Sequence, residues 1–211
     1  MADIENITLS VADTANAERF YSAFLGPYAP IRVRASEAAT AGFRGFTLAL
    51  TVAQPADVDL LVGAALDAGA TALKPATKSL WGYGGVLRAP DGTVWKVATS
   101  AKRNTAPASR RIEEFVLLLG VEDVVASKRF YVGQGMAVDK SFGRTYVQFT
   151  AEEGRVKLAL YRRRALAKDL GVAPEGSGSH RVVIGGSGGD FTDFTDPDGF
   201  EWEAAVAASA S

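Results

Sequence analysis

Apolar residues recur along the chain both in helical stripes and in short, strand-like runs. One stripe has the i, i+3, i+4, i+7 spacing of a single helix face and consists of Ala17, Phe20, Tyr21 and Phe24. Asp13, just before this stripe, is a residue type that caps helix N-termini. The run GFTLALTV (45–52) is rich in apolar and β-branched residues and predicts a strand. The pattern therefore predicts helices interspersed with strands.

The same reading extends to later segments of the chain. Pro55 suits the first turn of a second helix, and the stripe that follows it contains Val58, Leu61, Val62 and Ala65. The segments 82–88 and 93–99 predict a hairpin, because Ala89-Pro90-Asp91-Gly92 has Pro and Gly where a tight turn favours them. A short helix is expected over 163–170, ending at Gly171.

Two segments of the chain repeat in order. ITLSVADTANAERFY (7–21) parallels VLLLGVEDVVASKRFY (116–131), and RAPDGTVWKVA (88–98) parallels TDPDGFEWEAA (195–205). Both ends of a unit of about a hundred residues therefore occur twice, which indicates an internal duplication. We predict one domain at 1–100, a polar linker at 101–110, a second domain at 111–206 that lacks one helix, and a frayed tail at 207–211.

Composition narrows the function classes. The chain has 23 basic and 24 acidic residues, so nucleic acid and anionic membranes are not expected partners. It has no Cys, which excludes disulfides, zinc–thiolate sites and Cys nucleophiles and is typical of a cytoplasmic protein. The acidic start of the chain does not look like a signal peptide, and the longest apolar run (115–121) is too short to span a bilayer.

The motifs occur in a fixed order: a strand, an Asp, a helix ending in Phe-Tyr, a middle strand and helix, a Trp-Gly segment (Trp81-Gly82) and a terminal Pro-Asp-Gly hairpin. This ordered set resembles the vicinal oxygen chelate superfamily, which includes glyoxalase I, bleomycin-resistance proteins and extradiol dioxygenases. The resemblance implies an α+β fold of two tandem glyoxalase-like domains, built of paired βαβββ modules whose curled mixed sheets form clefts. It also implies a monomer or a homodimer.

The resemblance also locates the positions at which relatives hold a metal. In the first repeat these positions carry Asn6, Thr47 and Lys96, which are poor ligands, and a protonated ammonium has no lone pair to donate. In the second repeat they carry Val116, His180 and Glu203, and a further position falls near Ala159. Two protein ligands form an incomplete set, so we expect no cofactor, with a divalent metal at His180 and Glu203 as the alternative.

His180 is the only His in the chain, and three roles stay open for it. It could be a metal ligand, a catalytic general base, or a polar residue where a loop enters a strand. Lys96 and Glu203 each follow a Trp, so strand alternation sends them to the opposite sheet face from that Trp. Each of these charges either faces a cleft or is solvated.

Ligand pockets are mainly apolar with a few polar anchors. The resemblance places the Trp81–Tyr83 segment at a cleft mouth. The candidate ligand-binding residues are Arg44, Phe46, Trp81, Tyr83 and Lys96. The leading expectation is a metal-independent binder of an apolar or aromatic small molecule. The alternative is a metal-dependent lyase/isomerase or extradiol-type dioxygenase that uses His180 and Glu203, and a third reading is a purely structural role.

Overall fold

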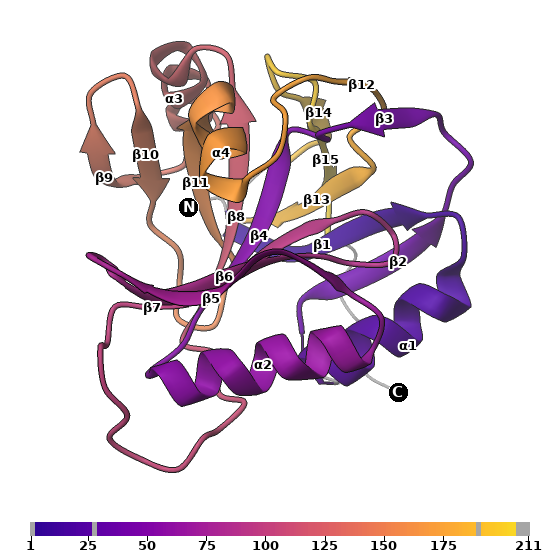
Figure 1. The fold of residues 1–211 in the computed structure, drawn as a ribbon. Coiled ribbons are helices and arrows are strands. Elements are labelled where there is room, and N and C mark those ends of the chain that lie inside the picture. The colour runs from indigo at the N-terminus through magenta and orange to yellow at the C-terminus, as the bar shows by residue number, and fades with distance from the viewer. Residues whose placement is uncertain (1–2, 27–28, 189–190, 206–211) are drawn as a thin grey trace.

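The computed structural model describes residues 3–26, 29–188 and 191–205. Within these ranges the chain forms two large β-sheets, a two-stranded ribbon and four helices (Figure 1). None of the described helices is both long and apolar enough to cross a membrane. The predicted α+β fold class is confirmed.

The larger sheet has eight strands in the order β5-β6-β7-β4-β8-β11-β10-β9. Its strands are β4 (Phe46–Thr51), β5 (Thr71–Ser79), β6 (Gly82–Arg88), β7 (Val94–Thr99), β8 (Glu114–Val121), β9 (Val138–Phe142), β10 (Tyr146–Phe149) and β11 (Lys157–Arg162). With helices α2 (Pro55–Asp67) and α3 (Val124–Gly133), they form two complete βαβββ units, β4-α2-β5-β6-β7 and β8-α3-β9-β10-β11. The units meet at the antiparallel pair β4–β8, where Thr47 lies opposite Leu118.

The smaller sheet has five strands in the order β14-β15-β13-β1-β2. Its strands are β1 (Asp3–Val11), β2 (Ile31–Ala35), β13 (Val182–Ser187), β14 (Phe194–Thr195) and β15 (Glu201–Ala204). It is built from two shortened units, β1-α1-β2 with helix α1 (Thr14–Leu25), and β13-β14-β15, in which no helix is found among the described residues. The ribbon pairs β3 (Thr40–Gly42) with β12 (Gly176–Gly178), which the sequence did not indicate.

Side-chain caps begin the two equivalent helices. A carboxylate oxygen of Asp13 accepts the backbone N–H of Asn16 at 2.9 Å, which confirms the predicted cap of α1. Asp123 does the same for α3, accepting from Val125 and Ala126. These bonds satisfy N–H groups that have no partner within the helix.

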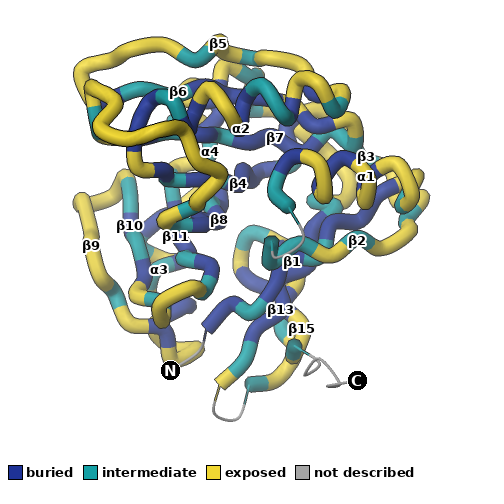
Figure 2. The backbone as a smooth tube through the Cα atoms, turned by 90° about the horizontal axis from the view of Figure 1, so that it is seen from below, coloured by how far each residue is buried: buried dark blue, intermediate teal, exposed yellow. Residues whose placement is uncertain are grey.

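Each sheet takes strands from both repeats. β1 of the first repeat pairs with β13 of the second, and β4 of the first pairs with β8 of the second. One hydrophobic core cluster runs through both repeats, and Figure 2 shows the central strands buried and the edge strands β5 and β9 exposed. The division at 101–110 stays a prediction, and residues 206–211, with the expected frayed tail, lie outside the described residues.

Helix α4 (Arg163–Leu170) begins and ends where the sequence predicts, and Gly171 ends it in the left-handed conformation. The helix lies against β8 and β11 on the face of the larger sheet opposite α2 (Figure 1). A second apolar cluster joins it to that face: Phe43, Val86, Val94, Leu166, Ala167 and Leu170. The concave side of the eight-stranded sheet is therefore filled by a helix of the same chain.

Candidate functional site

Strand β7 separates a core face from a cleft face, as alternation predicts. Trp95 is fully buried and packs against Tyr21 and Phe24 of α1, with ring centroids 5.7 and 5.2 Å away. Lys96 points to the opposite side, where its ammonium forms a 2.6 Å ion pair with Asp169 at the end of α4. Trp95 and Lys96 therefore lie on opposite faces of the sheet, and Lys96 borders a cleft while its side chain stays partly exposed.

A cleft of about 330 Å³ lies between strands β5, β6 and β7 and the C-terminal end of α4. Its apolar surface includes Pro75, Val86 and Ala98, with the Lys96–Asp169 ion pair at one side. Trp81 lies at its rim with 84% of its surface exposed. We call this space the Trp81 cleft.

Glycine keeps the floor of the Trp81 cleft open. A Cβ atom on Gly84 would lie 2.8 Å from the carbonyl oxygen of Val97 and 2.9 Å from the Cβ of Ala98, closer than real contacts allow. Any side chain at this position would push β6 and β7 apart and fill the cleft.

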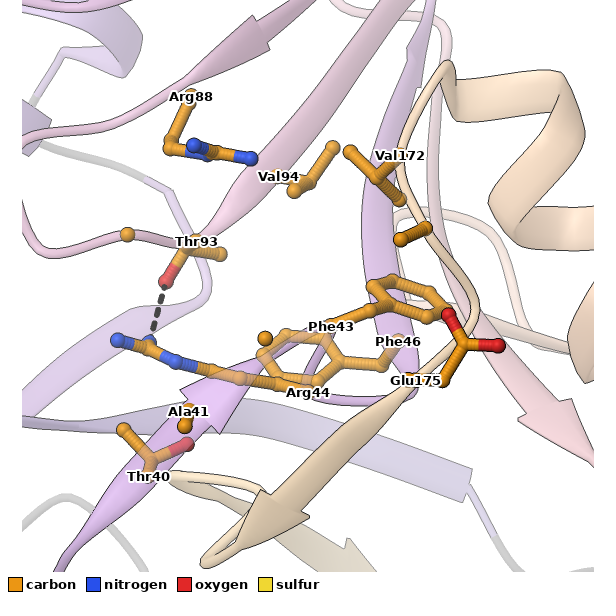
Figure 3. Close-up of a pocket in the computed structure, with 13 residues that line it drawn as sticks. Thr40, Ala41, Phe43, Arg44, Phe46, Arg88, Thr93, Val94, Val172 and Glu175 are labelled. Carbon is orange, nitrogen blue, oxygen red and sulfur yellow. Dashed lines mark hydrogen bonds between the residues drawn. The ribbon is translucent and has the colours of Figure 1, made fainter.

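Tyr83 borders the Trp81 cleft but is turned toward α2. Its hydroxyl donates a 2.7 Å hydrogen bond to Asp59, and this bond, more than burial, raises the pKa of Tyr83. Arg44 and Phe46 line a different cavity, near the other end of the β6–β7 hairpin (Figure 3). The structure therefore distributes the five predicted ligand-binding residues over two separate cavities.

His180 and Glu203 have separate surroundings. The Nδ1 and Nε2 atoms of His180 lie 2.5 and 3.1 Å from the backbone oxygens of Arg44 and Asp198, and its ring stacks on Phe200 at 4.1 Å. Glu203 instead forms a half-exposed 3.2 Å ion pair with Arg34. No contact joins the two candidate metal ligands.

The fold matches solved structures over almost its whole length. Maize glyoxalase I aligns with a TM-score of 0.60 and 14% identity, covering 96% of this chain and 91% of that one. A putative dioxygenase from Bacillus subtilis aligns with a TM-score of 0.54 and 12% identity, covering 86% of this chain and 69% of that one. The chain has the vicinal oxygen chelate fold. No protein-family model matches the sequence, and no curated protein matches it.

Strand register aligns the two repeats at the positions that the resemblance gives for metal ligands. In the pair β4–β7, Lys96 lies opposite Ala49, and Thr47 precedes Ala49 by two residues on β4. Glu203, the counterpart of Lys96, lies opposite Gly185 in the pair β13–β15. The residue two positions before Gly185 is Val183, which is therefore the counterpart of Thr47. His180 lies three residues before that position, in the loop that leads into β13.

The residues of the larger sheet do not fit a metal. Thr47 is fully buried and donates its hydroxyl to the backbone oxygen of Val94 at 2.8 Å. The side chains of Val116 and Ala159 have no atom that could coordinate a metal, and Lys96 is a cation paired with Asp169. Within residues 3–26, 29–188 and 191–205, no group of three or more His, Asp or Glu side chains is placed to hold a metal ion. No chemical step through a metal follows from these residues.

Sequence reasoning missed two parts of the site. Asp169 was not a candidate, although it ends a helix whose apolar stripe of Leu166, Ala167 and Leu170 implies a buried face. The two-cavity arrangement had no signal in the sequence, since it depends on where α4 lies against the sheet.

Proposed function

We propose that the protein binds an apolar or aromatic small molecule in the Trp81 cleft without a metal. The observation that carries this proposal is the cleft itself, an open, largely apolar space with an almost fully exposed Trp at its rim. Large exposed apolar side chains at a concave surface are typical of ligand sites.

The chemistry of the cleft favours an aromatic ligand. The ring of Trp81 is free to stack on a planar ligand, because its exposed surface is not used by the core. The Lys96–Asp169 ion pair offers both a hydrogen-bond donor and an acceptor at the side of the apolar floor. A neutral aromatic molecule with one polar substituent matches this combination.

The alternative, a metal-dependent lyase/isomerase or dioxygenase, receives no support from the placement of His180 and Glu203. A role limited to structure is less favoured than binding, since such a role would not need an open cleft beside an exposed Trp. The absence of Cys supports a cytoplasmic location for this binding function.

The proposal is tested by titrating the protein with N-phenyl-1-naphthylamine, a neutral aromatic dye. Binding is followed by the rise in the dye's own fluorescence in an apolar environment, a signal that does not depend on Trp81. We expect saturable binding that weakens about tenfold or more in Trp81→Ala, roughly 1.4 kcal/mol. Leu80→Ala is the matched control, because Leu80 is 77% exposed next to Trp81 and does not line the cleft.

Two outcomes would count against the proposal. One is a wild-type protein that shows no saturation with the dye or with a panel of neutral aromatic compounds. The other is an equal loss of affinity in Leu80→Ala, which would indicate nonspecific adsorption to the exposed turn.

A further inference from the structure

A second cavity of about 330 Å³ lies near the end of the β6–β7 hairpin farther from Trp81. The segment before β4, the end of β6, the start of β7 and the loop after α4 enclose it (Figure 3). Phe43 and Val94 belong both to its wall and to the apolar cluster of α4, whereas Val86 of that cluster lines the Trp81 cleft. The α4 cluster therefore separates the two cavities.

Arg44 brings a half-buried guanidinium to this cavity. It donates to the backbone oxygen of Asp91 and, at 3.5 Å, to the hydroxyl of Thr93. Gly92 permits this approach, because its φ is +90° and a Cβ there would lie 2.8 Å from a guanidinium nitrogen. Both acceptors are uncharged, so these hydrogen bonds leave the positive charge of Arg44 without a counter-ion.

No carboxylate forms an ion pair with Arg44 in the part of the chain that the structure describes. The nearby carboxylate of Asp91 accepts instead from the hydroxyl of Tyr21 at 2.8 Å and from the backbone N–H of Thr93. Burial is the largest cause that lowers the pKa of Arg44; the charge of Asp91 comes next and opposes it in part, and the positive charge of Arg181 lowers the pKa further. A partly buried guanidinium without a paired anion is unfavourable.

Arg88 adds a second guanidinium to the same cavity. It lies at the end of β6, opposite Val94, and forms no ion pair with any described residue. Glu175 is the one carboxylate among the lining side chains, and Figure 3 shows it on the far side of the phenylalanine rings from the Arg44 guanidinium. The Arg44 end of the cavity is therefore positive, and its wall is apolar.

We propose that this cavity binds a small organic carboxylate, with its carboxylate at Arg44 and Arg88 and its apolar body against Phe43, Phe46 and Val94. The planar fork of a guanidinium matches the two oxygens of a carboxylate, and the partly desolvated setting strengthens the pairing. The site is independent of the Trp81 cleft, so either can fail without the other.

The test compares benzoate with benzamide, which has the same shape and no charge, by nuclear magnetic resonance titration of the labelled full-length chain. We expect benzoate to shift the backbone amide of Thr93 and the side-chain N–H signal of Arg44 saturably, and benzamide to bind at least tenfold more weakly. Equal binding of the two compounds would overturn the proposal.

Variants localise the effect. Arg44→Gln is expected to weaken benzoate binding about tenfold or more, and Arg88→Gln several-fold; Arg88 makes no described hydrogen bond, so its variant should fold normally even if Arg44→Gln does not. Arg164→Gln, an exposed Arg on α4 outside the cavity, is the matched control and should leave affinity unchanged.

Two further variants separate this site from its surroundings. Glu175→Gln, which removes the lining carboxylate, should leave benzoate affinity equal or higher, and Trp81→Ala should not change it. Unchanged binding in both Arg variants, or a tenfold loss in Arg164→Gln, would contradict the assignment.

Discussion

Two tyrosines at equivalent places in the repeats donate hydrogen bonds to aspartates at different positions. The hydroxyl of Tyr21 donates to Asp91 at 2.8 Å, and that of Tyr131 donates to Asp196 at 2.6 Å. Tyr131 also accepts the indole N–H of Trp202 at 3.3 Å. Burial is the main reason that the pKa of each phenol lies well above its usual value, so both remain donors at neutral pH.

Tyr131→Phe is expected to destabilise the protein more than Tyr21→Phe does. Removing the Tyr131 hydroxyl leaves the indole of Trp202 and the buried Asp196 each without one partner, which typically costs about 1–3 kcal/mol, whereas Tyr21→Phe should cost about 1 kcal/mol. Urea unfolding of the two matched variants measures the difference. A larger loss in Tyr21→Phe would contradict this ranking.

The loss in Tyr131→Phe should also depend on pH. Burial raises the pKa of Asp196 above its usual 3.8, and the bond from Tyr131 partly opposes that rise. The bond therefore stabilises the ionised carboxylate, and its contribution is present above the folded-state pKa and declines as pH falls through it. The difference between wild type and variant should narrow on acidification from neutral pH toward pH 4.

Residue-level prediction from sequence succeeded where the cause is local. The Asp13 cap, the turn at Ala89–Gly92 and the opposite faces of Trp95 and Lys96 follow from propensity and alternation, and the structure confirms all three. The surroundings of His180 were not predictable, because its contacts come from backbone oxygens of Arg44, far away in sequence, and of Asp198.

Helix α4 shows the same limit at the scale of an element. Its bounds were predicted, since its stripe and its glycine stop are local signals. Its position was not, because four of its eight residues are charged and only Leu166, Ala167 and Leu170 mark the buried side. A short, basic helix does not reveal from sequence alone that it fills a cleft.

Leu170→Ala is expected to destabilise the protein by about 3 kcal/mol, because it removes a fully buried side chain between α4 and the sheet. Lys168→Ala, on the exposed side of the same helix, should change stability by no more than about 0.5 kcal/mol. Thermal and urea unfolding of the two variants provide the comparison. Equal stabilities would show that α4 does not pack against the sheet in solution.

At the scale of the whole molecule, the duplication was visible in the sequence and the exchange of strands was not. Motif spacing indicates that a unit occurs twice, but it does not predict whether a strand pairs with a strand of its own repeat or of the other repeat. The pairs β1–β13 and β4–β8 join segments that are far apart in the sequence, and no local sequence pattern predicts them.

Shared sheets predict a single cooperative unfolding transition, since neither repeat can lose its strands without exposing those of the other. Trp81 and Trp95 lie in the first repeat and Trp202 in the second, so Trp202→Phe reports on the first half and the double variant Trp81→Phe/Trp95→Phe on the second. Their fluorescence midpoints in urea, each measured against the far-ultraviolet circular dichroism midpoint of the same variant, should coincide. Separated midpoints would instead indicate two independently folding domains.

The pairing of β1 with β13 also sets the order in which the protein can be completed during synthesis. β4 can pair with its neighbour from the second repeat once β8 emerges near residue 114, but β1, finished at Val11, waits for its neighbour from that repeat until β13 begins at Val182. At roughly 5–20 residues per second, that wait is on the order of ten seconds or more. The larger sheet can thus assemble on the ribosome while the edge of β1 beside β13 stays open, and the smaller sheet closes last.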